Sequence, residues 1–172
     1  KLPIEKFFGV GKVTAEKMLK MGIHNGLELK EKSLNFLVNN FGKAGKYFYN
    51  IARAIDFREV NPDRIRKSIG AERTFSYDLF NMDQIYERTE QIAEKLIERC
   101  EKADTFGRTL TLKVKYSDFK QITRSKTIDK KIKKTVHLMQ IAEELFDQVN
   151  FTYNPVRLIG LSLTNLDNKG IE

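Results

Sequence analysis

One proline-containing stretch divides the chain into two parts, and it limits the fold more than any other feature. From Phe57 to Ser68 the sequence has a proline, few apolar residues and no helical or strand periodicity, which is typical of a connection between domains. A chain of 172 residues has the length of one ordinary domain or two small ones. We therefore expect a first domain at residues 1–60, a linker at 61–67 and a second domain at 68–172.

The first part is predicted to be a small all-helical domain. A short helix is expected over residues 12–20, and it ends at Gly22, because glycine suits the left-handed conformation that terminates many helices. A further apolar-periodic stretch covers 27–38. A third helical pattern covers 47–55, with Tyr47, Ile51, Ala54 and Ile55 on one side.

Beyond the linker, strand patterns alternate with patterns of amphipathic helices. Strands are expected at 69–77, 109–116, 119–128 and 156–166, and long helices at 82–102 and 130–149. Each helix has a single apolar stripe; that of the second consists of Ile132, Val136, Met139, Ala142, Leu145 and Phe146. The order β-α-β-β-α-β predicts an α+β domain whose four-stranded sheet is covered on one face by both helices.

The other face of this sheet is predicted to be open and free of bulky side chains. Small and polar residues alternate with apolar ones in two of its strands: Thr109, Thr111, Lys113 and Lys115 in one, and Gly160, Ser162 and Thr164 in the other. Hydroxyl and ammonium groups are typical contacts of a nucleic-acid phosphate backbone. The open face is therefore a candidate phosphate-binding surface.

The charge of the chain is concentrated in one segment. The net charge is +8, and the sequence pI is near 9.5, which favours a polyanionic partner. Residues 108–134 contain ten Lys or Arg and two Asp, so the rest of the chain is neutral in sum. The segment includes two strands that we assign to the sheet, which places much of the excess charge on that candidate surface.

Several classes of protein are excluded or disfavoured by the residues present. We see no apolar run of the roughly 18 residues that span a membrane and no signal-peptide pattern, so a cytoplasmic protein without membrane contact is expected. The single cysteine, Cys100, lies on an apolar stripe and is expected to be a buried structural thiol. We find no catalytic or metal-ligating constellation. The chain starts at Lys1 rather than at a methionine, which suggests a piece of a longer protein.

Two glycine turns precede helices in the first part. In Phe7-Phe8-Gly9-Val10-Gly11-Lys12 the glycines allow a tight turn, and the following amides are anion donors at a helix N-terminus. The segment resembles a helix-hairpin-helix motif of DNA-binding proteins, the alternative being an ordinary turn between helices. Phe41-Gly42-Lys43-Ala44-Gly45-Lys46 repeats the pattern, and here a flexible turn with two solvated lysines is an equal alternative.

Taken together, the motifs resemble the thumb, linker and little finger of a Y-family DNA polymerase of the DNA polymerase IV type. The resemblance covers nearly the whole chain in order, at 8–18, 41–45, 54–58, 66–70, 72–75, 108–119, 123–125 and 156–162. It implies an enzyme of translesion synthesis and DNA repair, a DNA-directed DNA polymerase and thus a nucleotidyltransferase. Its palm and fingers, with carboxylates that hold two magnesium ions, would lie upstream, so this chain itself is expected to need no cofactor.

The resemblance also implies partners and DNA-binding residues. The partner is primer-template DNA, and the whole enzyme would also bind a sliding clamp. The chain stops at Ile171-Glu172 without an evident clamp-binding peptide of glutamine and hydrophobic residues. The glycine turns and the resemblance mark Gly9, Val10, Gly11, Lys12, Lys43 and Gly45 in the thumb, and Ser68, Arg73, Thr74, Lys113, Lys115, Thr123, Arg124 and Ser125 in the little finger.

Two alternatives stay open. Split βαβ sheets also form RNA-binding modules, but these stack bases on aromatic side chains of the central strands, and the residues expected there are threonines and lysines. A self-contained enzyme or a structural adaptor is the other alternative, and it lacks a supporting motif.

Overall fold

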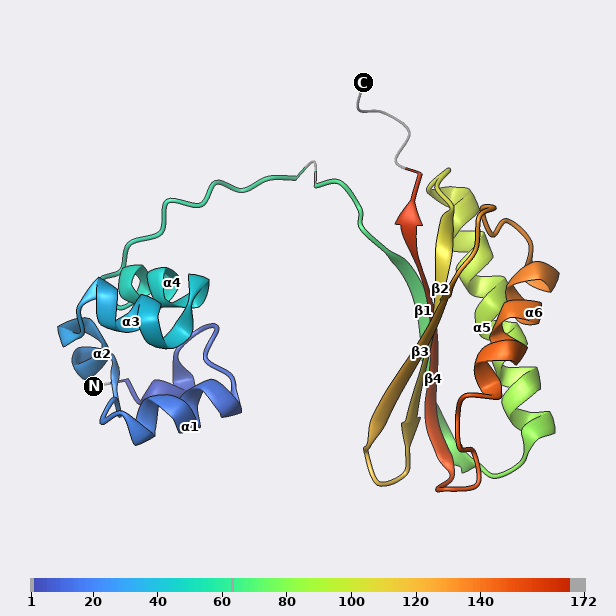
Figure 1. Cartoon of the computed structure of the whole chain (residues 1–172), viewed down its shortest axis with the longest axis horizontal. Coiled ribbons are helices and arrows are strands. Elements are labelled where there is room, and N and C mark those ends of the chain that lie inside the picture. Colours follow the sequence, from blue (N-terminus) through green and yellow to red (C-terminus); the bar gives the residue numbers. More distant parts are fainter. Residues whose placement is uncertain (1, 63, 168–172) are drawn as a thin grey trace. The chain divides into compact units, whose positions relative to one another are not determined.

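The chain folds into two units (Figure 1), and each unit has its own hydrophobic core. The computed structural model describes residues 2–62 and 64–167. The N-terminal unit is Lys1–Pro62 and the C-terminal unit is Asp63–Glu172. The chain end, where we looked for a clamp-binding peptide, falls at 168–172 and lies outside the described residues.

The N-terminal unit is helical. Its elements are η1 (Ile4–Lys6), α1 (Lys12–Lys20), α2 (Gly26–Glu31), α3 (Leu34–Phe41) and α4 (Lys43–Ile51). They enclose a small core of apolar side chains, made of Ile4, Val10, Ala15, Met18, Ile23, Leu29, Leu37 and Phe48. The all-helical prediction for this part of the chain is confirmed.

Two helix boundaries in this unit differ from the prediction. The stretch 27–38 forms two helices, because Lys32 is extended and the Ser33 hydroxyl caps a new helix by accepting the Phe36 amide at 3.2 Å. The pattern at 47–55 belongs to a helix that begins four residues earlier and ends at Ile51. The helix stops there because Ala54 has a φ of 57°, in the left-handed region.

The C-terminal unit has the predicted α+β order. Its elements are β1 (Ile69–Leu79), α5 (Met82–Lys102), β2 (Gly107–Tyr116), β3 (Gln121–Thr127), α6 (Thr135–Phe146) and β4 (Val156–Leu166). The strands form one antiparallel sheet in the order β1-β4-β2-β3. Figure 1 shows α5 and α6 on the same side of this sheet, so the other face is open.

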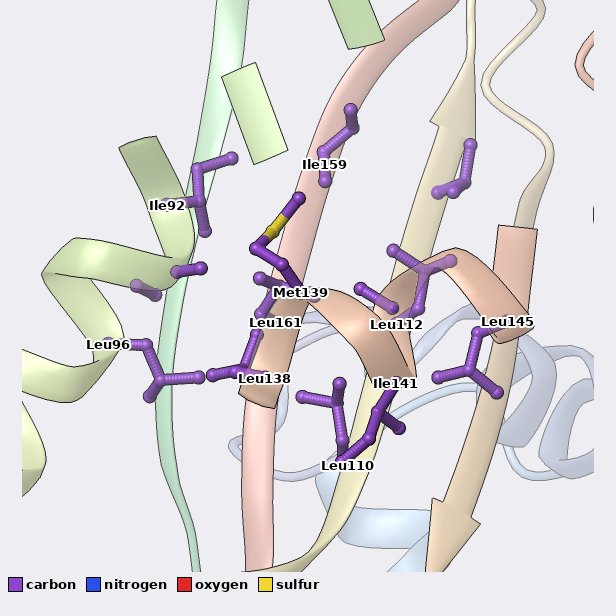
Figure 2. Close-up of a cluster of buried hydrophobic side chains, with 14 of the residues drawn as sticks. Ile92, Leu96, Leu110, Leu112, Leu138, Met139, Ile141, Leu145, Ile159 and Leu161 are labelled. Atoms are coloured by element: carbon purple, nitrogen blue, oxygen red, sulfur yellow. The ribbon is translucent and has the colours of Figure 1, made fainter. Parts of the chain in front are cut away.

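The core of this unit lies between the sheet and the two helices. Figure 2 shows Leu138 and Leu145 of α6 beside Leu110 and Leu112 of β2, with Ile92 and Leu96 of α5 and Ile159 and Leu161 of β4 around them. These side chains are at most 4% exposed. Because both helices pack on the same apolar face, the opposite face of the sheet stays uncovered by them.

The start of α6 was predicted wrongly. Residues 130–134 are not helical. The Ile132 amide donates to the Gly107 carbonyl at 2.9 Å, so this segment lies beside the start of β2. Val136, which we placed on the apolar stripe, is 70% exposed, whereas Leu138 and Ile141 are buried. The lysines of this segment therefore belong to a connection and not to a helix face.

Candidate nucleic-acid interface

The open face of the sheet is a grid of small and polar side chains. Strand register sets Gly70, Ser162, Thr111 and Ser125 in one row, Glu72, Gly160, Lys113 and Thr123 in the next, and Thr74, Leu158, Lys115 and Gln121 in the third. Leu158 is the one large apolar residue among these twelve, and it is 9% exposed. The surface is thus shallow, rich in hydroxyl groups and without an aromatic ring in these rows.

Lys113 is held by an acidic residue that the sequence analysis did not single out. Its Nζ lies 2.6 Å from Oε2 of Glu72, and the two side chains meet across Gly160, the residue between them in the row. A Cβ on Gly160 would lie 3.0 Å from the Cβ of Glu72 and 3.5 Å from that of Lys113. The small residue leaves room for the pair, which partly neutralises the centre of the face.

A hollow of about 410 Å³ opens around this pair. Thr111, Lys113, Thr123 and Ser162 line it, and so does the side chain of Arg99. Arg99 belongs to the last turn of α5, yet its guanidinium donates to the Gly70 carbonyl on β1. The sequence analysis missed Arg99. Because α5 follows β1 and runs back along it, the end of the helix lies near the start of the strand.

A second hollow, of about 510 Å³, continues along the start of β1. It is lined by Ser68 and by three cationic side chains, those of Arg66, Arg99 and Lys102. The Lys102 ammonium, with that of Lys95, lowers the pKa of the exposed Glu98 carboxyl to about 2, so this acid is charged at neutral pH. The two hollows share Arg99 and Gly70. Their cationic side chains outnumber the acidic ones, so their charge is complementary to that of a phosphate backbone.

Two arginines of the predicted DNA-binding set lie on the opposite side of the sheet. Arg73 pairs with Ile159 in the register and reaches Gln91 of α5 at 3.5 Å. Arg124 pairs with Leu112, and its Nε donates to the Gln148 carbonyl at 3.0 Å. Their neighbours Thr74, Thr123 and Ser125 do face the open side. The structure therefore brings these three together with Lys113 and Lys115 but separates the two arginines from them.

The first glycine turn precedes α1 as predicted. Gly9 has a φ of 82° and Gly11 is the N-cap of α1, with no side chain capping the helix, so the first amides of α1, including that of Lys12, are donors without a helical acceptor. Val10 differs, since its side chain is buried and its amide donates to the Phe7 carbonyl at 3.0 Å. The Tyr47 hydroxyl stabilises the turn by donating to the Phe8 carbonyl at 3.2 Å.

The second glycine turn is built differently. Lys43 is the first residue of α4 and is exposed, as a phosphate contact requires. Gly45 lies inside the helix, buried, and its amide donates to the Gly42 carbonyl at 2.9 Å. A Cβ on Gly45 would lie 2.2 Å from the Leu37 carbonyl oxygen of α3. Gly45 therefore allows α3 and α4 to approach closely, and its amide is not available to a ligand.

The described residues do not form a site for a metal ion or a reactive thiol. No three His, Cys, Asp or Glu side chains gather within 2–62 and 64–167, so these residues do not fit the magnesium ions that the family resemblance implies. Cys100 is fully buried, and burial raises the pKa of its thiol to about 11, as expected for a structural cysteine. Within the same residues no helix is long and apolar enough to cross a membrane.

Comparison with known proteins identifies relatives. DNA polymerase IV 2 of Agrobacterium fabrum is 48% identical over 167 residues, which are 97% of this chain and 47% of that protein. DNA polymerase IV of Bacteroides fragilis is 45% identical over 165 residues, with 96% of this chain and 45% of the relative covered. The chain thus spans about half the length of the curated relatives it matches.

A solved structure and a family model complete the comparison. A Y-family DNA polymerase chimera has a TM-score of 0.75 at 22% identity, over 96% of this chain and 48% of its own, which shows a shared fold. The model for the impB/mucB/samB family C-terminal domain matches residues 66–172. The resemblance to polymerases of the DNA polymerase IV type is therefore confirmed, and the chain belongs to the impB/mucB/samB family.

Proposed function

We propose that this chain grips primer-template DNA for a lesion-bypass DNA polymerase, chiefly through the phosphate backbone. The open face of the C-terminal unit carries the proposal, because two lysines stand among hydroxyl groups with no bulky side chain above them. Phosphate contacts fix a protein on the duplex without reading its sequence. Lys113, Lys115, Thr74, Thr123 and Ser125 supply such contacts, with Ser68 at the strand start.

The N-terminal unit supplies a second grip in this proposal. The amides at Gly9, Gly11 and Lys12 bind a phosphate of one strand, because the start of α1 is a preformed set of donors with a favourable dipole. Lys43 adds a side-chain charge at the start of α4. This unit therefore depends more on backbone donors than on charge.

The catalytic step of such an enzyme is assigned to residues outside this chain. In the proposal, carboxylates elsewhere in the whole polymerase hold the magnesium ions, which supply the charge stabilisation for nucleotidyl transfer. The present residues position the duplex. A sliding clamp and a cytoplasmic location belong to the same proposal for the whole protein, and the direct check of catalysis is that this chain alone does not extend a primer.

Salt dependence tests the proposed grip. The affinity of the chain for a duplex should fall with salt by roughly 0.9 log units per log unit of salt for each phosphate neutralised, and it should vary little between sequences. Fluorescence anisotropy with two unrelated duplexes of equal length measures both. A flat salt titration, or tight binding to one sequence only, would contradict the proposal.

RNA binding is the alternative to be tested in the same assay. RNA-recognition sheets present rings on their central strands, whereas the open-face positions of β2 and β4 in the three rows hold Thr111, Lys113, Lys115, Leu158, Gly160 and Ser162. Competition between single-stranded RNA and primer-template DNA decides, and preference for the RNA would reverse our assignment.

Removing the acid beside Lys113 should strengthen duplex binding. In Glu72→Gln the lysine no longer has a carboxylate at 2.6 Å, and one negative charge leaves the phosphate-facing surface. We expect the affinity to rise by less than the roughly eightfold that a whole phosphate contact contributes at about 0.1 M salt, because Lys113 already supplies a contact and only the opposing charge is removed. Glu94→Gln on the exposed side of α5 is the control, since it makes the same charge change on the helix layer. Equal gains in both variants would show that only net charge matters.

A further inference from the structure

The hairpin between β2 and β3 ends in an unusual turn. The Phe119 amide donates to the Tyr116 carbonyl at 3.0 Å, and the Tyr116 amide donates to the Lys120 carbonyl at 2.9 Å. In three-residue hairpin loops of this kind the last residue of the loop is left-handed and is usually glycine. Here that position holds Phe119, with a φ of 66°. A bulky side chain in this region of the Ramachandran map is uncommon and strained.

The ring of Phe119 is also exposed and lies between cations. It is 63% exposed, with the guanidinium carbon of Arg157 at 4.9 Å and Nζ of Lys115 at 5.7 Å from the ring centroid. Arg157 has Asp78 at 3.7 Å as a further neighbour. Since Lys115 stands in the third row of the open face, its contact with the ring places Phe119 at that end of the face. Figure 1 shows the loop that joins β2 to β3.

The acid in the same turn does not cancel this charge. The carboxylate of Asp118 lies 3.6 Å from Nζ of Lys120, and it accepts the Tyr153 hydroxyl at 3.0 Å. Its charge is therefore paired with Lys120 and Tyr153, and not with Lys115 or Arg157. Lys120 in turn lies over the Tyr153 ring, at 4.7 Å from the centroid. The tip combines an exposed ring with a local excess of positive charge.

We infer that Phe119 is a stacking platform for an unpaired base of the DNA strand that continues past the duplex, with Lys115 and Arg157 beside its phosphates. This inference rests on the proposed function. Within a duplex the faces of the bases are stacked on one another, so only an unpaired base offers a face to a ring. Aromatic stacking with cations beside it is how single strands are held without reading their sequence, and the rows of the open face offer no other ring.

Three DNA molecules and two variants test the inference with the full 172-residue chain. The molecules share one duplex: the first is blunt, the second has a short single-stranded overhang, and the third has the same overhang with abasic sites. The abasic overhang keeps the phosphates and removes the faces of the bases. We expect the chain to bind the normal overhang about tenfold more tightly than the abasic one, as for one stacked base.

Phe119→Asn and Phe119→Trp separate the ring from the fold. Asparagine tolerates the left-handed region, so Phe119→Asn should unfold no earlier than the wild type and bind the blunt duplex equally well, yet lose the tenfold difference. Phe119→Trp should retain the difference. A 2-aminopurine in the overhang should be quenched by the wild type and by Phe119→Trp only.

The outcomes separate this inference from the proposed function. If the blunt duplex binds with the expected salt dependence but normal and abasic overhangs bind alike, the stacking platform is refuted and the duplex grip stands. The same holds if Phe119→Asn keeps the difference. If the blunt duplex does not bind, the duplex grip fails, and the two overhang strands used alone, normal against abasic, still decide whether Phe119 stacks a base.

Discussion

Duplex affinity should fall about 60-fold at roughly 0.1 M salt when Lys113 and Lys115 are both replaced by alanine. Each phosphate contact contributes roughly 0.9 log units at that salt relative to 1 M, so two lost contacts remove about 1.8. The slope of log affinity against log salt should become shallower by the same amount, and the two proteins should converge near 1 M. Anisotropy titrations across a salt series measure the change in slope directly.

A charge-matched double variant controls for this result. Arg88→Ala with Lys95→Ala removes two positive charges from α5, on the helix layer of the same unit. We expect only a small loss of affinity and no change of slope. If both double variants lower the slope equally, the effect comes from net charge, and the open face is not the binding surface. The unfolding temperature of each variant shows whether the fold is intact.

The N-terminal unit should lose about 3 kcal/mol of unfolding free energy in Gly45→Ala. The added Cβ would lie 2.2 Å from the Leu37 carbonyl oxygen and 2.6 Å from the Val38 nitrogen, so α3 and α4 must separate. Overpacking a core typically costs about 1–3 kcal/mol, and these obstacles are backbone atoms that cannot rotate away. A unit of this size has only about 3–9 kcal/mol in total, so the substitution should remove about a third of its stability or more.

Two observations make this prediction specific. Alanine stabilises a helix relative to glycine by about 1 kcal/mol. A net loss of stability therefore reports the steric clash between the added Cβ and α3. Gly11→Ala is the matched control, because no atom lies within 4 Å of its added Cβ and its cost should stay below about 1 kcal/mol. Amide hydrogen exchange, followed separately in 2–62 and 64–167, should show faster exchange in the first range only. Equal effects of the two substitutions would contradict the packing argument.

The fold of the C-terminal unit could be predicted from local patterns. The helix at 82–102 and the strand at 156–166 were predicted with the boundaries that the structure has. Long periodic segments leave little ambiguity, and the side chain of Asn81 caps the helix by accepting the Gln84 amide at 2.8 Å. The prediction of a helix over 130–134 was wrong for the opposite reason. The segment is short, and its one buried residue, Ile132, bonds to Gly107, which is distant in the sequence.

The composition of the candidate site could be predicted only in part. Period-two alternation would already have separated Arg124 from Thr123 and Ser125, but the resemblance grouped them as one motif. The pair of Lys113 with Glu72 depends on the register of strands that are 41 residues apart. Arg99 depends on where a helix ends relative to a strand edge. Such contacts are tertiary, and no local pattern encodes them.

The bond from Arg99 to the Gly70 carbonyl bears on how the protein behaves at high concentration. β1 is an outer strand of the sheet, and unpaired carbonyls on outer strands invite pairing with a strand of another molecule. A cationic side chain folded over that edge occupies an acceptor and places a repelling charge beside it. A side chain that lines the hollow on the open face thus also opposes self-association, and losing it would favour aggregates joined edge to edge.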